Sequence, residues 1–484
     1  MKPVLAAADV AKVEQAWVAQ QSGDDGTWPL MAAAGEAVAQ RVMALKPRGA
    51  IWVLAGKGNN GGDGYVAAWH LQQAGFEVCL VAPLGPSRPG SDADRARRQW
   101  LKVGSEQARL PSGEPAVVVD ALLGSGQRGP LKEPLAALVA TVNDFAASRL
   151  AVDVPTGLNA DTGVVDEAVF QASETLSFIA FKPGLLTGDG PGCVGRLALE
   201  TLGVEAAVLA QSLNLAVHWH LATAPAWPER VANGHKGHFG QVRIVAGSPG
   251  MGGAGLLAAR AALAAGAGKV FWHTSPGNAQ AVLMAQPELM TANPDVSGLP
   301  EAAVVVLGPG LGREQEVRAR CELLTRQQPR GVLDADGLVW LAENPTTLPG
   351  WVLTPHPGEA GVLLGISTAA VQADRCAAAL ALSQRYQAVV VLKGAGSLIA
   401  DQGQLWFSHP GTVAMATPGM GDTLAGWIGG LMAQGFSSRQ AALSATWWHA
   451  ALAARLARHQ RIVLATDLLP LIQAARLTTP VPDH

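Results

Sequence analysis

Two glycine-rich segments that carry an aspartate, one in each half of the chain, constrain the fold more than any other feature. They are GKGNNGGDG at residues 56–64 and TPGMGDTLAG at residues 417–426. Each stands where a strand or loop would turn into a helix, so that free backbone N–H groups and the positive end of the helix dipole point at an anion. Because the two segments differ in pattern and lie far apart, they predict two phosphate-binding active sites on two domains.

The length and composition of the chain agree with two cytoplasmic domains and argue against several other classes. At 484 residues the chain exceeds what a single hydrophobic core usually holds. Only 15% of the residues are charged, and the net charge of −3 gives no reason to expect a nucleic acid or a membrane surface as partner. The four cysteines lack the spacing of a zinc site or a disulfide framework, which fits a reducing cytoplasm. The sequence shows neither a signal peptide nor an apolar run long enough to span a membrane.

Short apolar runs alternate with helical patterns in the first half of the chain. The pattern predicts strands over residues 50–56 and 76–83, with a helix over 65–75 between them. Further β-branched runs within 115–126 and 149–157 end in Asp and then Gly. This rhythm predicts an α/β fold with a parallel sheet, which binds ligands at the carboxyl ends of its strands.

The rhythm breaks once and then starts again. The break contains ATAPAWPERVAN (222–233), which has two prolines and little periodicity. A second series of strands begins with QVRIVAGS at 241–248. We therefore expect a domain boundary at about 212–222, with one α/β domain over residues 1–212 and another over 222–480.

Polar residues mark the first candidate site. The loop after the first strand carries Asn59, Asn60 and Asp63 among its glycines, and Asp120 and Asp153 each follow an apolar run. Taken singly, the loop could be an ordinary strand-to-helix turn, and each aspartate could cap the next helix. Together, three loops with polar groups at one sheet edge indicate a ligand site.

These motifs identify the first half by resemblance. NNGGDG, DALLGSGQRGP and DVPTG resemble the N-terminal YjeF domain, the NAD(P)H-hydrate epimerase family, and the resemblance implies a Rossmann-like α/β/α sandwich. It also implies that the hydrated dinucleotide is bound by Asn59, Asn60, Gly61, Gly62, Asp63, Gly124, Ser125, Gly126, Gln127, Arg128, Gly129, Pro130 and Asp153.

The same resemblance implies an ion site and a catalytic acid. Asn60, Asp120 and Thr156 would hold a potassium ion, and the hydroxyl of Thr156 replaces that of the Ser more common in the family. In the damaged cofactor, water has added to the carbon next to the ring nitrogen. Inversion of that carbon through loss and return of hydroxide needs an acid–base group, for which Asp153 is the candidate.

The second candidate site rests on Asp422. It follows Gly419 and Gly421 and opens an apolar helix. The backbone amides of residues 419–422 could form an anion hole for a transferring phosphoryl group, with Asp422 as the base toward an acceptor hydroxyl. The alternative is that Asp422 merely caps the helix and that the glycines allow a tight turn.

This arrangement resembles the anion hole of ribokinase-like enzymes and, more narrowly, the C-terminal YjeF domain, the NAD(P)H-hydrate dehydratase family. The motifs that carry this narrower resemblance are HKGHFGQV (235–242), SPGMGGAG (248–255), GPGLG (308–312), DADGL (334–338), TPHPGE (354–359) and KGAGS (393–397). The resemblance implies that Ala254, Gly310, His356 and Asp422 contact the hydrate and that Lys393, Gly394, Ala395, Gly396, Ser397 and Gly421 bind the adenine nucleotide. Without the resemblance, His356 would be taken for an ordinary strand-end histidine, and the family more often has Thr at the position of Ser397.

The two resemblances together imply a bifunctional enzyme that repairs hydrated nicotinamide cofactors. The first domain would interconvert the R and S forms of NADHX and NADPHX. The second would phosphorylate the added hydroxyl of the S form and then eliminate phosphate to restore the reduced cofactor. Magnesium would offset the phosphate charge. The bacterial members resemble ADP-dependent enzymes and the eukaryotic ones ATP-dependent enzymes. Because a fused two-domain chain of this composition resembles the bacterial members, ADP, which becomes AMP, is the expected donor.

Two other functions are compatible with the sequence. The chain could be a ribokinase-like small-molecule kinase with an accessory N-terminal domain, which would release a stable phosphorylated product. Alternatively, the N-terminal half could be a binding module without catalytic activity. Small apolar helices such as residues 446–456 also predict a homo-oligomer.

Overall fold

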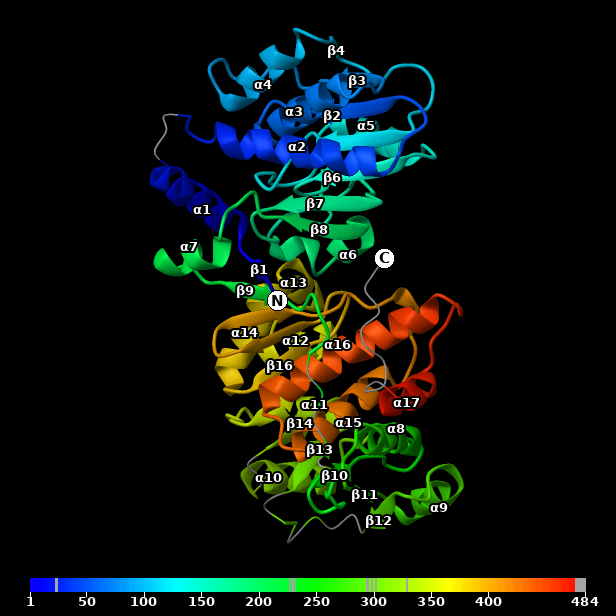
Figure 1. The fold of residues 1–484 in the computed structure, drawn as a ribbon. Coiled ribbons are helices and arrows are strands. Elements are labelled where there is room, and N and C mark those ends of the chain that lie inside the picture. Colours follow the sequence, from blue (N-terminus) through cyan, green and yellow to red (C-terminus); the bar gives the residue numbers. More distant parts are fainter. Residues whose placement is uncertain are drawn as a thin grey trace. The chain divides into compact units, whose positions relative to one another are not determined.

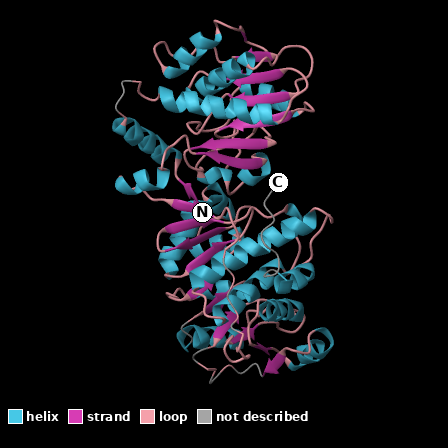
Figure 2. Cartoon of the chain, in the orientation of Figure 1, coloured by secondary structure: helices cyan, strands magenta, loops and turns pink. Residues whose placement is uncertain are grey.

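The protein forms two compact α/β units in a computed structural model. The structure describes residues 1–21, 25–225, 227, 230, 232–292, 296, 299–300, 303–327 and 330–474. Apart from Met1, the first unit runs from Lys2 to His220 and the second begins at Leu221. Figures 1 and 2 show strands flanked by helices in both units, as the alternating pattern predicts.

The first unit is built on a parallel sheet with the strand order β4-β3-β2-β5-β6-β7-β8. The first and last strands of the unit, β1 and β9, lie outside this sheet and form a short antiparallel pair. The elements are β1 (Lys2–Val4), α1 (Ala7–Gln20), α2 (Trp28–Ala44), β2 (Ile51–Ala55), α3 (Asn59–Gln73), β3 (Val78–Val81), α4 (Asp92–Trp100), β4 (Glu106–Gln107), β5 (Val117–Ala121), α5 (Leu135–Asn143), β6 (Ser148–Val152), β7 (Glu174–Phe178), α6 (Gly190–Cys193), β8 (Arg196–Glu200), α7 (Ala206–Ser212) and β9 (His218–His220).

Helices cover both faces of this sheet. The side chains of β2 and β5 are buried along their whole length, which explains why these strands read as continuous apolar runs. On one face they pack against α2, α3 and α4 in one hydrophobic cluster. On the other face a second cluster joins them to α5. Because the strands are parallel, their carboxyl ends lie at one edge of the sheet.

Helix α3 begins earlier than the sequence predicts. The pattern predicts a helix over 65–75, whereas α3 starts at Asn59 and includes most of the glycine-rich segment. Glycine is a poor helix former, but close backbone packing requires it here. A Cβ on Gly61 would lie 1.9 Å from the carbonyl oxygen of Gly56, and a Cβ on Gly56 would lie 1.8 Å from that of Leu122. The glycines thus let the first turn of α3 lie directly against the strand ends.

The second unit has the strand order β12-β11-β10-β13-β14-β15-β16-β17-β18, parallel from β12 to β16 and antiparallel beyond. Its elements are β10 (Gln241–Val245), α8 (Gly252–Ala264), β11 (Lys269–His273), α9 (Pro276–Ala285), β12 (Met290–Ala292), β13 (Val304–Leu307), α10 (Gln315–Gln327), β14 (Gly331–Leu333), α11 (Asp336–Glu343), β15 (Trp351–Leu353), α12 (Pro357–Leu364), α13 (Thr368–Ala373), α14 (Arg375–Tyr386), β16 (Val389–Leu392), β17 (Leu398–Asp401), β18 (Gln404–Phe407), α15 (Met420–Ala433), α16 (Ser438–Ala457) and α17 (Ala465–Ala474).

Helix α15 is the central helix of the second unit. It packs against α8 and α16 and lies over β10, β13 and β14 (Figure 1). Close contact with α8 depends on a glycine, because a Cβ on Gly426 would lie 2.0 Å from the carbonyl oxygen of Ala258. Since β10 and β13 to β16 are parallel, the segments that follow them all lie at the edge where α15 begins.

Among the residues that the structure describes, no helix has both the length and the apolar character that crossing a bilayer requires.

The two tryptophans of α16 are hydrogen-bonded within the second unit. The indole N–H groups of Trp447 and Trp448 donate to the carbonyl oxygens of Leu221 (2.9 Å) and Pro225 (3.3 Å), respectively. These tryptophans therefore pack within the unit, and the homo-oligomer stays a prediction.

The close packing at α3 predicts the sign of a stability change. Gly61→Ala should lower the free energy of unfolding by about 2 kcal/mol or more, since the added methyl group collides with the backbone of Gly56. Gly192→Ala, at a helical glycine with no atom within 4 Å of the added Cβ, should be neutral or stabilising by up to about 1 kcal/mol. Urea unfolding of both variants measures the difference. Equal effects would show that the contact does not constrain α3.

Candidate active sites

In the first unit, Asp153 is the residue that directly follows β6 at the carboxyl edge of the sheet. Its φ angle is +64°, a left-handed backbone conformation that is uncommon for residues other than glycine. Its Oδ1 atom accepts hydrogen bonds from the Phe178 backbone N–H (3.3 Å) and the Ser177 hydroxyl (3.4 Å). The same oxygen forms an ion pair with Lys182. The carboxylate is therefore fixed in one direction.

Lys182 is a site residue that sequence reasoning missed. Its residue is only 1% exposed, and besides Asp153 its Nζ atom donates to the Phe178 carbonyl oxygen (3.0 Å) and the Ser177 hydroxyl (3.3 Å). A lysine buried this deeply needs a charged partner. A usable signal in the sequence is that this lysine ends the apolar run LSFIAFK (176–182).

Two more carboxyl groups interact with this ion pair. Asp63, in the second turn of α3, is buried, and burial together with Asp153 and Glu14 raises its pKa well above the usual value, although Lys182 opposes the rise. Burial also raises the pKa of Glu14, which reaches the site from α1. Sequence reasoning missed Glu14, since nothing in an amphipathic helix marks one glutamate as half-buried beside a site.

Asp120 lies near the carboxyl end of β5 and accepts hydrogen bonds from Thr156. The Thr156 backbone N–H donates to one carboxylate oxygen of Asp120 and the Thr156 hydroxyl to the other, each at 2.8 Å, and the Leu122 N–H adds a third bond at 3.2 Å. Burial nevertheless raises the pKa of Asp120 to about 6. The Leu123 N–H donates to the Thr156 hydroxyl oxygen at 3.0 Å, which ties the next loop to the same set.

The Asn60 side chain is buried beside that loop without a partner. Both its Oδ1 and its Nδ2 atom are buried and make no hydrogen bond within the described part of the chain. A Cβ on Gly124 would lie 3.2 Å from the Asn60 side chain, so the two predicted loops meet here. Orphaned buried polar atoms are rare in folded proteins and often mark an unfilled ligand position.

The rest of the predicted loop 124–130 is largely exposed and is hydrogen-bonded to the segment that contains Thr156. The Gln127 side-chain oxygen accepts from the Gly157 N–H at 2.8 Å, next to Thr156. Arg128 donates to the Ser125 carbonyl oxygen at 3.0 Å and pairs with Asp161 at 3.5 Å. The structure thus brings the three predicted strand-end loops together, while Gly126, Gly129 and Pro130 lie at the surface.

In the second unit, Asp422 lies in the first turn of α15. The turn is entered through Gly419, which has a left-handed φ of +87°. Burial and the nearby Asp334 raise the pKa of Asp422 to about 6, while Lys393 lowers it and Glu359 raises it. A carboxyl group with this pKa is a competent base at neutral pH.

Lys393 holds the negative charges of this site together. Its Nζ atom lies 2.8 Å from Oδ1 of Asp334 and 3.8 Å from Oε2 of Glu359. A Cβ on Gly421 would lie 3.1 Å from the same Nζ atom, which places the start of α15 directly beside it. Although burial opposes it, the attraction of Asp334 and Glu359 leaves the pKa of Lys393 raised.

Asp334 and Glu359 were not predicted as site residues, although both belong to motifs that carry the family resemblance, DADGL (334–338) and TPHPGE (354–359). Asp334 follows β14 directly and is 1% exposed, and Glu359 lies in the first turn of α12. An aspartate at the end of a buried strand was a usable signal, since the same rule had picked out Asp120 and Asp153. The contact with Lys393 could not be predicted from the sequence, because it joins residues far apart in the chain.

His356 has a definite structural role as the N-cap of α12. Its Nδ1 atom accepts from the backbone N–H groups of Gly358 (3.0 Å) and Glu359 (3.2 Å), and the Glu359 side chain accepts from the His356 N–H at 2.7 Å. This pair of bonds is a capping box. The imidazole is exposed, and it borders a cavity of about 270 Å³.

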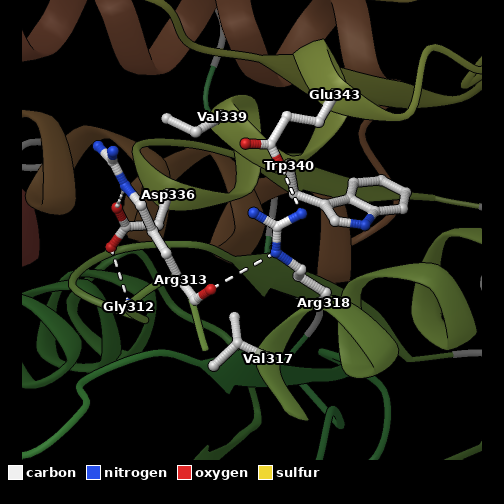
Figure 3. Close-up of a pocket in the computed structure, with 8 residues that line it drawn as sticks. All are labelled: Gly312, Arg313, Val317, Arg318, Asp336, Val339, Trp340 and Glu343. Atoms are coloured by element: carbon white, nitrogen blue, oxygen red, sulfur yellow. Dashed lines mark hydrogen bonds and ion pairs between the residues drawn. The ribbon is translucent and has the colours of Figure 1, made fainter. Parts of the chain in front are cut away.

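An ion pair between Arg313 and Asp336 (3.6 Å) forms part of the wall of that cavity. Figure 3 shows the pair from a neighbouring pocket of about 10 Å³, large enough for about one water molecule. Asp336 also accepts from the Gly312 N–H at 2.9 Å. The larger cavity is therefore the one with room for part of a ligand beside His356.

The remaining predicted residues lie on the segments that follow β10, β13 and β16, with Ala254 in the first turn of α8. A Cβ on Gly310 would lie 3.1 Å from that of Ala254, so these two predicted residues are neighbours. Residues 393–397 form the turn between β16 and β17, closed by a bond from the Ser397 hydroxyl to the Gly394 carbonyl oxygen (3.1 Å). The buried Arg375 supports this turn through the Lys393 carbonyl oxygen at 3.2 Å.

Comparison with known families agrees with the two units. Residues 28–184 match the model of the YjeF-related protein N-terminus, and residues 242–474 match that of NAD(P)H-hydrate dehydratase. The bifunctional NAD(P)H-hydrate repair enzyme Nnr of Coxiella burnetii is 41% identical over 92% of this chain and 93% of its own length. The enzyme of the same name from Escherichia coli is 38% identical over 94% and 90%.

The chain belongs to the bifunctional NAD(P)H-hydrate repair enzymes. The family that the motifs predict is thus confirmed. The parallel strands and alternating helices confirm the α/β class of both units. Among solved structures, an ADP/ATP-dependent NAD(P)H-hydrate dehydratase from Bacillus subtilis, co-crystallised with ATP and Mg²⁺, is 29% identical over 52% of this chain and 99% of its own, with a TM-score of 0.46.

Proposed function

We propose that this repair enzyme interconverts the R and S forms of NADHX and NADPHX and dehydrates the S form to NADH or NADPH. The epimerase function is assigned to residues 1–212 and the dehydratase function to residues 222–480. The observation that carries the proposal is the position of Asp422 near Lys393 in the first turn of α15, whose backbone N–H groups receive no side-chain cap from the described residues. The name of the family model that matches the second unit, NAD(P)H-hydrate dehydratase, and the bifunctional repair enzymes among the relatives support the proposal.

In the dehydratase domain, Asp422 would accept the proton of the added hydroxyl as that oxygen attacks the terminal phosphate of the nucleotide. The N–H groups of residues 419–422 would stabilise the charge on the transferring phosphoryl group. Elimination of phosphate from the phosphorylated hydrate then restores the ring double bond, so one ADP yields AMP and phosphate. Ala254, Gly310 and His356 would contact the hydrate.

The adenine nucleotide would lie at the start of α15 and the turn after β16. Gly421 and residues 393–397 border this place, and Lys393 brings a positive charge to it. We propose ADP as the donor, because the relatives that match over most of the chain include bacterial enzymes at 41% and 38% identity. Rates with equal concentrations of ADP and ATP decide this point.

The residues of the dehydratase site fit magnesium. No group of three or more His, Cys, Asp or Glu side chains in the described part of the chain is arranged to hold a metal ion. Mg²⁺ does not need such a group, because it usually keeps several waters and binds through one or two carboxylates and the substrate phosphates. Asp334 and Glu359 would supply these carboxylates. When bound, the ion would offset the charge of the transferring phosphoryl group.

In the epimerase domain, Asp153 would be an acid–base group near the hydroxyl of the hydrate. Loss of that hydroxyl leaves a planar carbon next to the ring nitrogen, and water can return on either face. A carboxylate fixed by Lys182 and the Phe178 N–H is suited to proton transfer at one atom. Asn59 to Asp63 and Gly124 to Pro130 would bind the dinucleotide around it.

The residues of the epimerase domain also fit potassium. The Asn60 amide oxygen, which has no hydrogen-bond partner among the described residues, lies next to the loop that Thr156 and Asp120 hold in place. Amide, carboxylate and hydroxyl oxygens are the hard ligands that alkali cations prefer. We propose that Asn60, Asp120 and Thr156 hold the ion and that it offsets the charge of the buried Asp120.

Replacing one carboxylate at a time should separate the two activities. With a mixture of R and S hydrates, Asp153→Asn should recover reduced cofactor only from the S fraction, apart from slow spontaneous exchange. Asp422→Asn should recover almost none, with the dehydration rate at least about 100-fold lower, while it still interconverts the epimers. Chromatography of both hydrates against time measures each result.

Other outcomes of this experiment would contradict the proposal. An Asp153→Asn enzyme with the wild-type exchange rate would make the N-terminal half a binding module. A stable phosphorylated product in place of reduced cofactor would make the C-terminal half a small-molecule kinase.

Potassium should stabilise the first unit through Asn60. In a buffer with tetramethylammonium as the cation, K⁺ at ten times its Kd should raise the free energy of unfolding by about 1.4 kcal/mol. Asn60→Leu should remove this dependence, whereas Asn59→Leu, at the exposed neighbouring position, should keep it. Thermal unfolding over a series of K⁺ concentrations measures the effect, and a K⁺ dependence that survives Asn60→Leu would move the ion elsewhere.

A further inference from the structure

The carboxyl groups around Asp153 have unequal surroundings. Asp153 is held by the ammonium group of Lys182, by a backbone N–H and by a hydroxyl. Asp63 is equally buried, yet no hydrogen bond to its carboxyl group is found within the described part of the chain. Two buried carboxyl groups whose surroundings differ in this way are suited to opposite protonation states and hence to opposite roles.

We propose that the buried Lys182 fixes Asp153 as the proton acceptor of the epimerase site and that Asp63 is the proton donor. This inference rests on the proposed epimerase function and assigns residues within it. Lys182 is a positioning residue, because it acts through Asp153. Its three hydrogen bonds, to Asp153, Ser177 and the Phe178 carbonyl oxygen, leave the ammonium group no freedom to turn toward a ligand.

The charges around Asp63 favour its neutral form. Asp153 and Glu14 both raise the pKa of Asp63 beyond the effect of burial, and Lys182 only partly opposes them. Glu14 has a raised pKa of its own, mainly through burial. The site therefore combines a carboxyl group whose neutral, proton-donating form is favoured, Asp63, with a carboxylate that is paired with the ammonium group of Lys182.

The proposed step balances in protons and electrons. Asp63 donates its proton to the hydroxyl oxygen, the carbon–oxygen bond breaks, and water leaves with the bonding electron pair. The lone pair of the ring nitrogen forms a double bond to that carbon. A water molecule then adds from the other face, the double-bond electrons return to nitrogen, and the proton of the water goes to Asp153. Exchange with solvent returns the proton to Asp63.

Substitution of Lys182 tests the positioning role. Lys182→Met should lower kcat for epimer exchange at least about 100-fold with little change in KM, and the acid side of the pH–rate profile should move to higher pH by about one unit or more. Lys182→Arg should restore part of the rate and of the profile, because it keeps the charge. Lys12→Met, which removes an exposed lysine paired with Asp9, is the matched control and should keep both.

Substitution of Asp63 tests the donor role independently of whether the lysine variant folds. Wild-type exchange should fall at high pH as Asp63 loses its proton, and Asp63→Asn should be at least about 100-fold slower, without that alkaline fall. In H₂¹⁸O, each epimerisation should place ¹⁸O in the hydroxyl group.

The failures of the inference and of the proposed function can be told apart. A slow Lys182→Met enzyme with an unchanged pH profile and no rescue by arginine would make the lysine merely structural and overturn the inference. Epimerisation without ¹⁸O uptake, or an unchanged alkaline fall in Asp63→Asn, would also overturn it. A wild-type enzyme that does not epimerise would instead reject the proposed function.

Discussion

In each unit, a lysine at the edge of a parallel sheet neutralises an aspartate that directly follows a buried strand. Lys182 pairs with Asp153 in the first unit, and Lys393 pairs with Asp334 in the second. Removing one partner of such a pair would leave an uncompensated charge out of water, which is strongly destabilising. Both candidate sites depend on these pairs, because the lysine reduces the repulsion between the paired aspartate and a further carboxyl group nearby. That further group is Asp63 in the first unit and Asp422 in the second.

Parallel strands explain why the polar groups meet at all. The segments after β2, β5 and β6 lie at one edge of the first sheet, and those after β10, β13, β14, β15 and β16 at one edge of the second. Helices α3 and α15 then begin at these edges, where their free N–H groups can face an anion. Glycines in both helices permit close packing, Gly61 in the first turn of α3 and Gly426 farther along α15, where that helix contacts α8. The same architecture thus serves two different reactions.

Local sequence patterns were enough to predict which residues stand at the ends of strands and at the starts of helices. Apolar runs that end in an aspartate located Asp120 and Asp153, and glycines before a helix located Asp422. The start of α3 was misplaced because glycine propensity argues against a helix, whereas packing against β2 and β5 outweighs it. Lys182, Glu14 and the pairing of Lys393 with Asp334 escaped for another reason. Each is defined by contacts between distant segments, and one sequence gives no measure of such contacts.

Fusion of the two domains gives the proposed repair a chemical rationale, since a dehydratase that accepts only the S form needs an epimerase to use the R form. The most direct test is therefore the total yield. The intact chain is incubated with a hydrate mixture of known R and S content, ADP and Mg²⁺, and the absorbance of reduced nicotinamide is followed to completion. The account predicts recovery well beyond the S fraction, at a rate above spontaneous exchange. No recovery with ADP or ATP would contradict it.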